Sequence, residues 1–209
     1  MGGLLASGGG ADVTLACADG ELVEAHALVL SVRSPVFAAL LDTGAPWASG
    51  AHEAPRQPVP VPPEVTSHTL RRLLHFLYTD ELTPASAEEA QHLLNAADVY
   101  DVPRLFAICE NALRDALTVD NAAITLTLAD QHGATALKRA TLAWIIPHTV
   151  EVMATDGWRH LVASRPSLTE VLLHTVATGL PPPEAAVGGD GRDESDEAER
   201  NKRRRTSAP

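Results

Sequence analysis

The N-terminal part of the chain alternates apolar and polar residues, a pattern typical of β-strands. Two such runs, DVTLACA at 12–18 and ELVEA at 21–25, are joined by Asp19-Gly20. Asp-Gly between alternating apolar residues is a strong signal for a hairpin turn in which both residues take positive φ. The pattern therefore predicts a β-hairpin at the start of the fold.

From His26 the pattern changes to a helical one. Apolar residues recur at helical spacing up to Val32. Ser34-Pro35 then matches a helix N-cap followed by proline at the first helical position. The apolar stripe of this second predicted helix is Phe37, Leu40 and Leu41.

Residues 42–58 are rich in Gly, Ala and Pro and predict a loop, with Trp47 as its one large aromatic side chain. In QPVPVPPEV, which follows, the prolines alternate with other residues. In an extended strand, all the missing N–H groups would face one side, while Val59 and Val61 could still bond to a neighbour on the other side. This predicts an edge strand whose outer rim cannot be extended.

The rest of the chain carries helical patterns. Thr66-Ser67 predicts one helix start, Ser86 with Glu89 matches a capping box, and Asp101 marks a third start. Further helical patterns lie at 120–132, 135–146 and, less regularly, 149–178. Residues 179–209 consist largely of Pro, Gly and charged residues, so we expect a disordered tail.

Composition places the chain among folded proteins. Hydrophobic residues make up 45% and the mean hydropathy is −0.01. No apolar run reaches the roughly 18 residues needed to span a bilayer, and no basic region precedes the apolar residues at the N-terminus. Cys17 and Cys109 are far apart in the sequence and do not form a CxxC motif, which suits a protein of a reducing, intracellular compartment. We therefore expect a soluble intracellular protein with no membrane partner.

The charge pattern argues against nucleic-acid binding. Acidic side chains outnumber basic ones in the part predicted to fold, whereas gripping a phosphate backbone takes many Lys and Arg on one face. The basic run Lys202, Arg203, Arg204 and Arg205 near the C-terminus suits capture by an import receptor. It predicts accumulation in the nucleus alongside a cytoplasmic pool. A generic solvated charge run is the alternative interpretation.

Asp12, His26 and Ser34 stand in an order that a hydrolase triad could use. Ser34 precedes Pro35 at a predicted helix start, so its oxygen is better used as the N-cap. No G-x-S-x-G turn or Gly-rich loop lies near Ser34 to supply an oxyanion hole. The three residues are therefore expected to build the fold rather than to react.

The sequence offers no cofactor or metal signature. His68 and His75 form at best an i, i+7 pair, and no Cys or carboxylate completes a tetrahedral set. P-loop, GxGxxG and HExxH motifs are absent from the sequence. We expect no metal and no cofactor.

Six segments, in order, resemble a BTB/POZ domain and its helical extension in the speckle-type POZ (MATH-BTB) family. They are ADVTL, AHALVLSVRSPVF, LLHFLYTDEL, LLNAADVYDVPRLFAICENAL, LTVDNAAITLTLADQHGATALKRATLAWIIPH and TDGWRHLVASRPSL. The resemblance implies an α+β chain: a BTB/POZ fold with a small mixed sheet flanked by a helical cluster, then an all-α BACK-like extension. The implied divisions are a partial dimerisation segment at 1–11, the BTB/POZ domain at 12–117, the BACK-like extension at 118–178 and the tail at 179–209.

The resemblance also implies a function. In that family the BTB domain dimerises and binds a cullin scaffold, while a MATH domain captures substrates for ubiquitination. Catalysis belongs to the recruited conjugating enzyme, so this chain is expected to be an adaptor and not an enzyme. Other BTB proteins are the expected homo- or heterodimer partners. The cullin-contact candidates are Leu40, Leu41, Asp42 and Trp47, and the dimer-interface candidates are Leu4, Leu5 and Leu28.

The sequence departs from the family pattern in several places. No MATH domain precedes the BTB part, and GGLL resembles only the end of the first dimer-forming helix. Ser49 stands where the cullin-binding loop usually carries Glu. Ala27 replaces a basic residue, so Asp12, if buried, would depend on His26 or backbone donors.

Two alternatives follow from these departures. The chain could be a non-catalytic nuclear scaffold or a dominant-negative dimer partner of full-length MATH-BTB proteins. It could also be a truncated gene model whose MATH region lies upstream.

Overall fold

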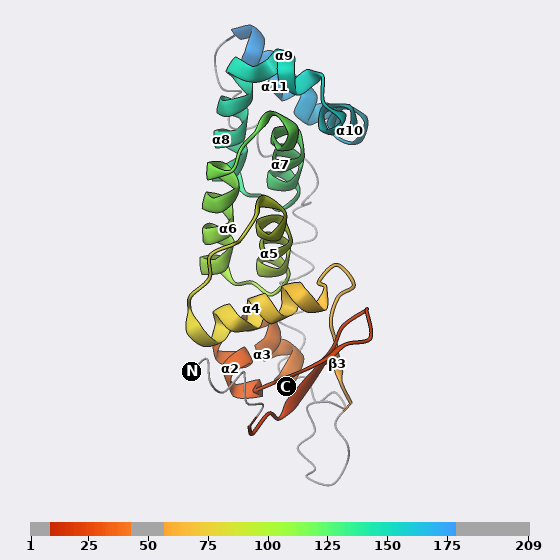
Figure 1. Ribbon diagram of the computed structural model, residues 1–209, viewed down its shortest axis with the longest axis vertical. Coiled ribbons are helices and arrows are strands. Elements are labelled where there is room, and N and C mark those ends of the chain that lie inside the picture. The colour runs from red at the N-terminus through yellow and green to blue at the C-terminus, as the bar shows by residue number, and fades with distance from the viewer. Residues whose placement is uncertain (1–8, 43–56, 179–209) are drawn as a thin grey trace, which may run out of the picture.

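The computed structural model describes residues 9–42 and 57–178. The molecule is elongated (Figure 1): a small sheet with α2, α3 and α4 forms one end, and helices stack away from it toward the other end. Within the described part, no helix is long and apolar enough to cross a membrane.

The sheet has three strands in the order β2-β1-β3. β1 (Val13–Ala16) pairs antiparallel with β2 (Leu22–Ala25) and parallel with β3 (Val59–Pro60). The Val61 N–H also donates to the Ala16 carbonyl at 2.9 Å. The hairpin is therefore confirmed, and so is the proline-flanked edge strand, because β3 lies at the end of the described sheet.

The hairpin turn differs from the one that the sequence predicts. Gly20 has a φ of +84°, but Asp19 is not among the described residues with positive φ. The Cys17 N–H donates to the Glu21 carbonyl at 2.9 Å, and the Gly20 N–H donates to the Cys17 carbonyl at 3.0 Å. The loop therefore has three residues and needs only one left-handed position, so the expectation of two positive φ angles was wrong.

Three helices pack around the sheet. α2 (Ala27–Arg33) and α3 (Pro35–Asp42) are separated by Ser34, and α4 (Ser67–Thr79) follows the third strand. The Thr66 hydroxyl accepts from the Thr69 N–H at 3.2 Å, which confirms the predicted cap of α4.

α5 (Ala87–Val99) and α6 (Pro103–Asp115) form the next pair. The Ser86 hydroxyl accepts from the Glu89 N–H as expected, but the Glu89 carboxylate reaches the Ala85 N–H instead of that of Ser86. The predicted start of α6 at Asp101 was wrong. Asp101 is left-handed, with a φ of 49°, and the helix begins at Pro103 because proline suits the first turn.

The C-terminal half is entirely helical in its described part. α7 (Val119–Gln131) and α8 (Thr135–Ile145) form a pair, followed by a 3₁₀ turn, η1 (Ile146–His148). The irregular pattern at 149–178 divides into three helices rather than one. They are α9 (Thr149–Met153), α10 (Asp156–Ser164) and α11 (Pro166–Thr178). The α+β fold class, with its helical extension, is confirmed.

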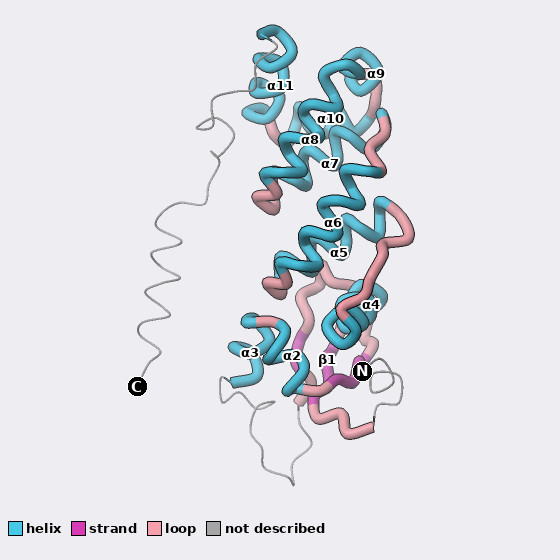
Figure 2. The backbone as a smooth tube through the Cα atoms, turned by 90° about the vertical axis from the view of Figure 1, so that its left-hand side faces the viewer, coloured by secondary structure: helices cyan, strands magenta, loops and turns pink. Residues whose placement is uncertain are grey.

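Two apolar cores hold the molecule together. The first runs from the sheet through α4, α5 and α6 and continues into Ala129, Ala134 and Leu137 of α7 and α8. The second lies among the later helices, around Leu126 and Trp158. Figure 2 shows the α7–α8 pair stacked on the α5–α6 pair. The first core therefore crosses residue 118, where the sequence suggests a division; that division stays a prediction.

Candidate protein-interaction surfaces

Two large apolar side chains stand on the outer face of α2. Leu28 is 76% exposed and Val32 is 75% exposed, whereas Leu30 of the same helix is fully buried. Residues four apart lie on one face of a helix, and adjacent exposed apolar residues are typical of a surface that another protein covers. We call Leu28 and Val32 the α2 stripe. The sequence identifies Leu28 as a dimer-interface candidate; Val32 was missed, although its spacing from Leu28 was an available signal.

An ion-pair cluster fixes α2 to the body of the molecule. The Asp80 carboxylate, just after α4, pairs with Arg33 of α2 at 2.5 Å and also with Arg104 of α6. The Arg33 guanidinium lies 6.0 Å from the ring centroid of Phe76. The hydrogen bond from Arg33 holds the pKa of Asp80 below its usual range. Desolvation raises this pKa, but the positive charge of Arg104 lowers it further. The helix that bears the α2 stripe is thereby held at its C-terminal end.

Ser34 is fully engaged in building the fold. It is buried; its hydroxyl donates to the Tyr100 carbonyl at 2.5 Å and accepts from the Phe37 N–H at 3.1 Å. The predicted cap is confirmed. Because the hydroxyl is used in both directions and its partners are main-chain groups, it is not a nucleophile activated by His26.

The His26 ring is likewise engaged. Its Nδ1 lies 2.7 Å from the Tyr78 hydroxyl, and its Nε2 lies 3.2 Å from the Gly9 carbonyl. The Gly9 carbonyl can only accept, so Nε2 donates to it, and in the neutral ring Nδ1 then accepts from the Tyr78 hydroxyl. That hydroxyl also accepts from the His26 backbone N–H at 2.9 Å. Burial raises the pKa of Tyr78, which keeps this donor protonated. His26 is half-buried, and its ring connects Gly9, before β1, to Tyr78 of α4.

Asp12 does not lie in the buried position that the sequence analysis considered. Asp12 is exposed, and its carboxylate accepts a hydrogen bond from the Ala27 N–H at 2.6 Å. It lies immediately before β1, where water reaches the carboxylate, so it does not need a buried cation. Of the two partners that the sequence suggested, His26 or a backbone donor, the carboxylate bonds to the backbone donor.

The predicted cullin contact begins at the end of α3. Leu40 and Leu41 are half-buried and pack against the first core, and Asp42 is exposed at the last helical position. Trp47 falls within 43–56, outside the described residues. The dimer candidates Leu4 and Leu5 and the basic run Lys202 to Arg205 also lie outside them.

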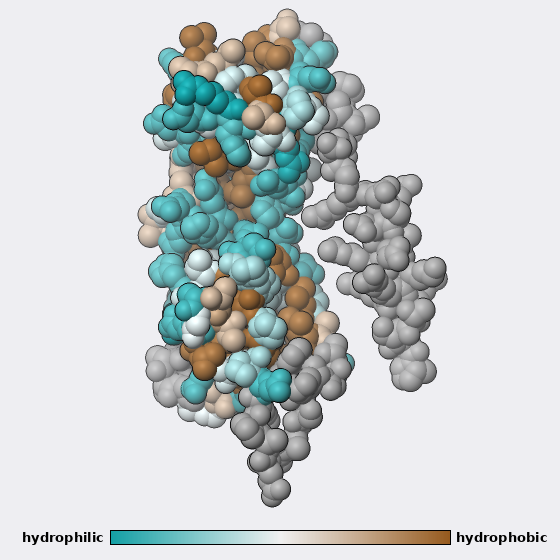
Figure 3. Space-filling model, turned by 90° about the vertical axis from the view of Figure 1, so that its right-hand side faces the viewer, coloured by the Kyte–Doolittle hydropathy of each residue, from teal (hydrophilic) through white to brown (hydrophobic). Residues whose placement is uncertain are grey.

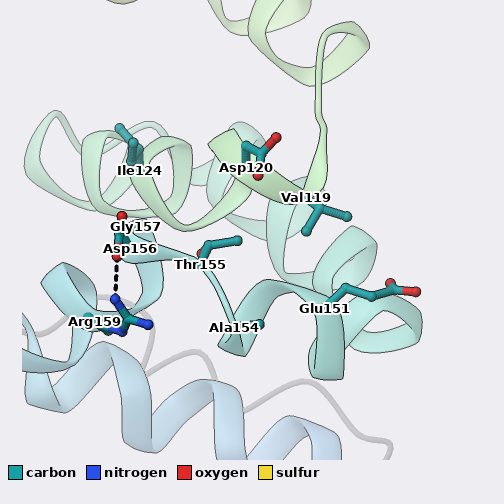
Figure 4. A pocket seen from close by; sticks show the side chains of 9 residues that line it. All are labelled: Val119, Asp120, Ile124, Glu151, Ala154, Thr155, Asp156, Gly157 and Arg159. Atoms are coloured by element: carbon teal, nitrogen blue, oxygen red, sulfur yellow. Dashed lines mark hydrogen bonds and ion pairs between the residues drawn. The ribbon is translucent and has the colours of Figure 1, made fainter.

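A hollow of about 740 Å³ opens at the far end, between α7, α9 and α10 (Figure 4). Its lining mixes apolar side chains such as Ile124 with charged ones such as Asp120, and Asp156 is paired with Arg159. The Thr155 hydroxyl in this lining caps α10: it donates to the Val152 carbonyl at 2.7 Å and accepts from the Trp158 N–H at 3.2 Å. On the face shown in Figure 3, hydrophobic residues form separate groups rather than one continuous band.

The cysteines and histidines do not form a reactive centre in the described ranges. Cys17 and Cys109 are free and buried. Burial raises the pKa of Cys109 to about 12. The pKa of Cys17 is also raised, mainly by burial and to a smaller extent by the negative charges of Asp19 and Glu21. Within residues 9–42 and 57–178, no group of three His, Cys, Asp or Glu could hold a metal ion.

Comparisons with known proteins agree with this arrangement. Residues 1–117 match the family described as BTB/POZ domain, and residues 121–173 match the BACK domain of the BPM/SPOP type. BTB/POZ and MATH domain-containing protein 4 of Arabidopsis thaliana is 36% identical over 193 residues, covering 85% of this chain and 39% of that protein. BTB/POZ and MATH domain-containing protein 3 of the same plant is 36% identical over 187 residues, covering 83% and 44%.

The chain thus spans about two fifths of the length of these curated relatives. The match to the BTB/POZ family covers more than half of the chain, including the sheet, α2 with its exposed stripe, and the α5–α6 pair. The protein belongs to the BTB/POZ domain family, and its α7–α11 region carries a BACK domain of the BPM/SPOP type.

Proposed function

We propose that this chain is a non-catalytic adaptor that links a cullin-RING ubiquitin ligase to partner proteins for their ubiquitination and degradation. Family membership supports a protein-interaction role, since BTB and BACK domains are interaction domains. The observation that carries the proposal is the α2 stripe: two large apolar side chains, each about three-quarters exposed, on a helix whose last residue, Arg33, pairs with Asp80. Such a surface serves association rather than chemistry.

The cullin contact would lie at the end of α3 and in the segment after it. Ser34 fixes the start of α3, and the apolar contacts of Leu40 and Leu41 fix its last turn. Asp42 is exposed at that end. The end of α3 is therefore well defined, and we propose Trp47, in the sequence that follows it, as the apolar anchor. A large aromatic residue is the usual centre of such a contact.

Binding to a purified cullin N-terminal domain tests this proposal. We expect saturable binding by calorimetry or pull-down, weakened at least about tenfold by Trp47→Ala, in line with the loss of an interface anchor. Leu22→Ala, which removes an exposed apolar side chain from β2, is the matched control and should bind as wild type. No wild-type binding above the bead background, and no change with Trp47→Ala, would refute the cullin contact.

The second candidate function is a nuclear BTB scaffold or dominant-negative partner that pairs with full-length MATH-BTB proteins. The α2 stripe favours it as well, because pairing does not require the cullin contact. Size-exclusion chromatography with light scattering on the 22.1 kDa chain, alone and mixed with such a protein, separates the two. Strictly monomeric behaviour in both samples excludes this candidate.

We propose nuclear accumulation through Lys202 to Arg205, on the basis of the run of four basic residues alone. Fluorescent fusions with and without alanine at these four positions provide the measurement. An unchanged nuclear fraction after the replacement would contradict an import role.

A further inference from the structure

The hollow at the far end of the molecule is bordered by three helices, and we call it the α7–α10 hollow. The first two turns of α7 supply one wall, and α9 with the start of α10 supplies the other (Figure 4). A Cβ at Gly157 would lie 3.3 Å from Cγ1 of Ile124, so glycine lets α10 begin directly against α7. The two walls therefore meet at a close contact between helices.

A large apolar side chain on the α7 wall is left uncovered. Ile124 is 46% exposed, whereas the preceding Ala123 is fully buried in the second core. Asp120 lies four residues before Ile124, so its carboxylate and the apolar side chain share one face of α7. A single exposed apolar residue is ordinary on a protein surface. This one borders a hollow beside a charged group, and apolar surface combined with a few polar groups in a concavity is typical of a binding site.

The charges around the hollow are unbalanced. Its lining includes the carboxylates of Asp120, Glu151 and Asp156, but only one guanidinium, that of Arg159. Arg159 pairs with Asp156 within α10. Asp120 and Glu151 are exposed and make no hydrogen bond or ion pair with a residue in the described ranges. The lining therefore has an excess of two negative charges, which lie on separate helices and attract cations into the hollow.

The occupant that fits these features is a peptide segment with basic and aliphatic side chains. Arginine and lysine carry a cation on an aliphatic stem, so one side chain can pair with a carboxylate while its stem covers apolar surface. The volume of about 740 Å³ lies within the range of known ligand sites, roughly 300–1,000 Å³. An anionic partner would instead be repelled by the two unpaired carboxylates.

We propose that the α7–α10 hollow binds a short segment of a partner protein in which basic and aliphatic residues are neighbours. Asp120 and Glu151 pair with the basic side chains, and Ile124 packs against an aliphatic one. The Thr155 hydroxyl is already engaged as the cap of α10 and makes no contact with the segment. This inference goes beyond the adaptor role, because it gives the helical extension a partner of its own, separate from the cullin contact proposed at the end of α3.

Methyl NMR with a defined peptide tests the proposal at the hollow itself. The full chain is isotope-labelled at the isoleucine methyl groups, and Ile124→Val assigns the Ile124 signal. The probe is the capped hexapeptide GRLRLG; GQLQLG lacks its charges and GRSRSG lacks its aliphatic side chains. We expect GRLRLG to shift the Ile124 signal saturably with a Kd of about 100 µM or tighter, and the two controls to bind at least about tenfold more weakly. The signal of Ile108, in the first core, should not move. No saturable shift of Ile124, or equal affinity for all the peptides, overturns the inference.

Neutral variants of matched shape separate the charge of the hollow from the charge of the whole protein. D120N/E151Q removes the two unpaired carboxylates and should weaken GRLRLG binding at least about tenfold, since pairs between ionised groups are the strong ones. E24Q/E170Q changes the net charge equally on β2 and α11 and should leave the Kd unchanged. All the replaced side chains are exposed, so thermal melts should show an intact fold. Equal weakening by both variants, or none by the first, contradicts the proposed pairing.

A bulky side chain tests the location without changing any charge. Ala154 is exposed and lines the hollow, so Ala154→Trp should occupy the space and abolish measurable binding of GRLRLG. Ala143→Trp, at an exposed position of α8, is the matched control and should bind as wild type. Unchanged binding by Ala154→Trp would mean that the peptide binds elsewhere and would overturn the inference.

The cullin N-terminal domain is the competing occupant, and its addition separates this inference from the proposed function. At saturation it should leave the Kd of GRLRLG unchanged. Displacement of the peptide would make the hollow part of the cullin contact, which overturns this inference and leaves the adaptor function intact. Absence of cullin binding refutes the proposed function, while the peptide measurements still decide whether the hollow is a binding site.

Discussion

The hydroxyl of Ser34 donates a hydrogen bond to the main-chain carbonyl of Tyr100, 66 residues away in the sequence, at 2.5 Å. The Phe37 and Tyr100 rings also stack, with centroids 4.2 Å apart and planes 10° from parallel. The corner between α2 and α3 is thereby locked to the end of α5. This contact positions two of the surfaces proposed for partners, the α2 stripe before it and the end of α3 after it.

Removing the Ser34 hydroxyl should destabilise the protein. Ser34→Ala removes the cap of α3 and leaves the buried Tyr100 carbonyl without this donor, so we expect a loss of about 2 kcal/mol in the free energy of unfolding. Urea denaturation followed by circular dichroism measures it. Ser31→Ala, in the middle of α2, is the control and should change the value by less than about 0.5 kcal/mol. Equal effects for the two variants would contradict the role of Ser34.

Asp80 should stabilise the protein in a pH-dependent way. Its pKa is lowered, first by the hydrogen bond from Arg33 and also by Arg104. The contribution of the carboxylate is therefore complete above its unfolded pKa of about 3.9 and is lost as the pH falls through the lower folded value. Asp80→Asn should lower the Tm at pH 7 and converge with wild type near pH 2. Glu64→Gln, an exposed loop carboxylate, is the control. A Tm difference that does not change with pH would refute this ionic role.

Leu137 should stabilise the BTB part although it lies on α8. It is 2% exposed and belongs to the core that begins at the sheet. Leu137→Ala should cost about 2–4 kcal/mol and speed the reaction of the buried Cys109 thiol, which lies in the same core. Leu173→Ala on α11, half-exposed, should cost less than about 1 kcal/mol. Unchanged Cys109 reactivity in Leu137→Ala would mean that the two halves unfold independently.

The two thiols should be inert in the native protein. Burial raises the pKa of Cys109 to about 12, so the thiolate is a very minor species at pH 8. A disulfide reagent such as Ellman's should label well under one thiol in minutes at pH 8, and both thiols in denaturant. The Cys17→Ala variant shows which of the two thiols is responsible for any slow labelling of the native protein. Rapid native labelling of two thiols would contradict the packing around both residues.

The α2 stripe should control self-association. Leu28→Asp with Val32→Asp places charge on both exposed positions and should shift light scattering from dimer to monomer, at least about a hundredfold in Kd, since unpaired charge in an apolar interface is costly. Thermal melts should show an intact fold, because neither side chain is buried. Asp at the exposed positions Leu22 and Val150 is the control. A dimer of unchanged affinity would exclude the stripe as the interface.

The features predicted correctly from the sequence are mostly local. Caps at Ser34, Thr66 and Ser86 follow from side-chain oxygens that reach N–H groups three residues on. Where a neighbour in space decides, the sequence was insufficient. Asp101 carries a helix-start signal, yet Asp101 itself takes a left-handed conformation. The helix therefore starts two residues later, at Pro103. The sequence does not decide whether Asp12 is buried, and its position just before β1 leaves it in water.

The candidate surfaces show the same contrast between features set by the local sequence and features set by the fold. Leu28, Leu30 and Val32 are all apolar residues of one predicted helix, and periodicity gives no way to distinguish the buried Leu30 from its exposed neighbours. The sequence does determine the hairpin, the proline-limited edge strand and the helical character of the extension, because these depend on backbone preferences within a few residues.

Only the tertiary structure decides which α2 face remains exposed and that Asp80 joins α2 to α6. Each of these depends on residues that folding brings together from distant parts of the chain. Burial and ion pairing are properties of that assembly, and no local pattern encodes them.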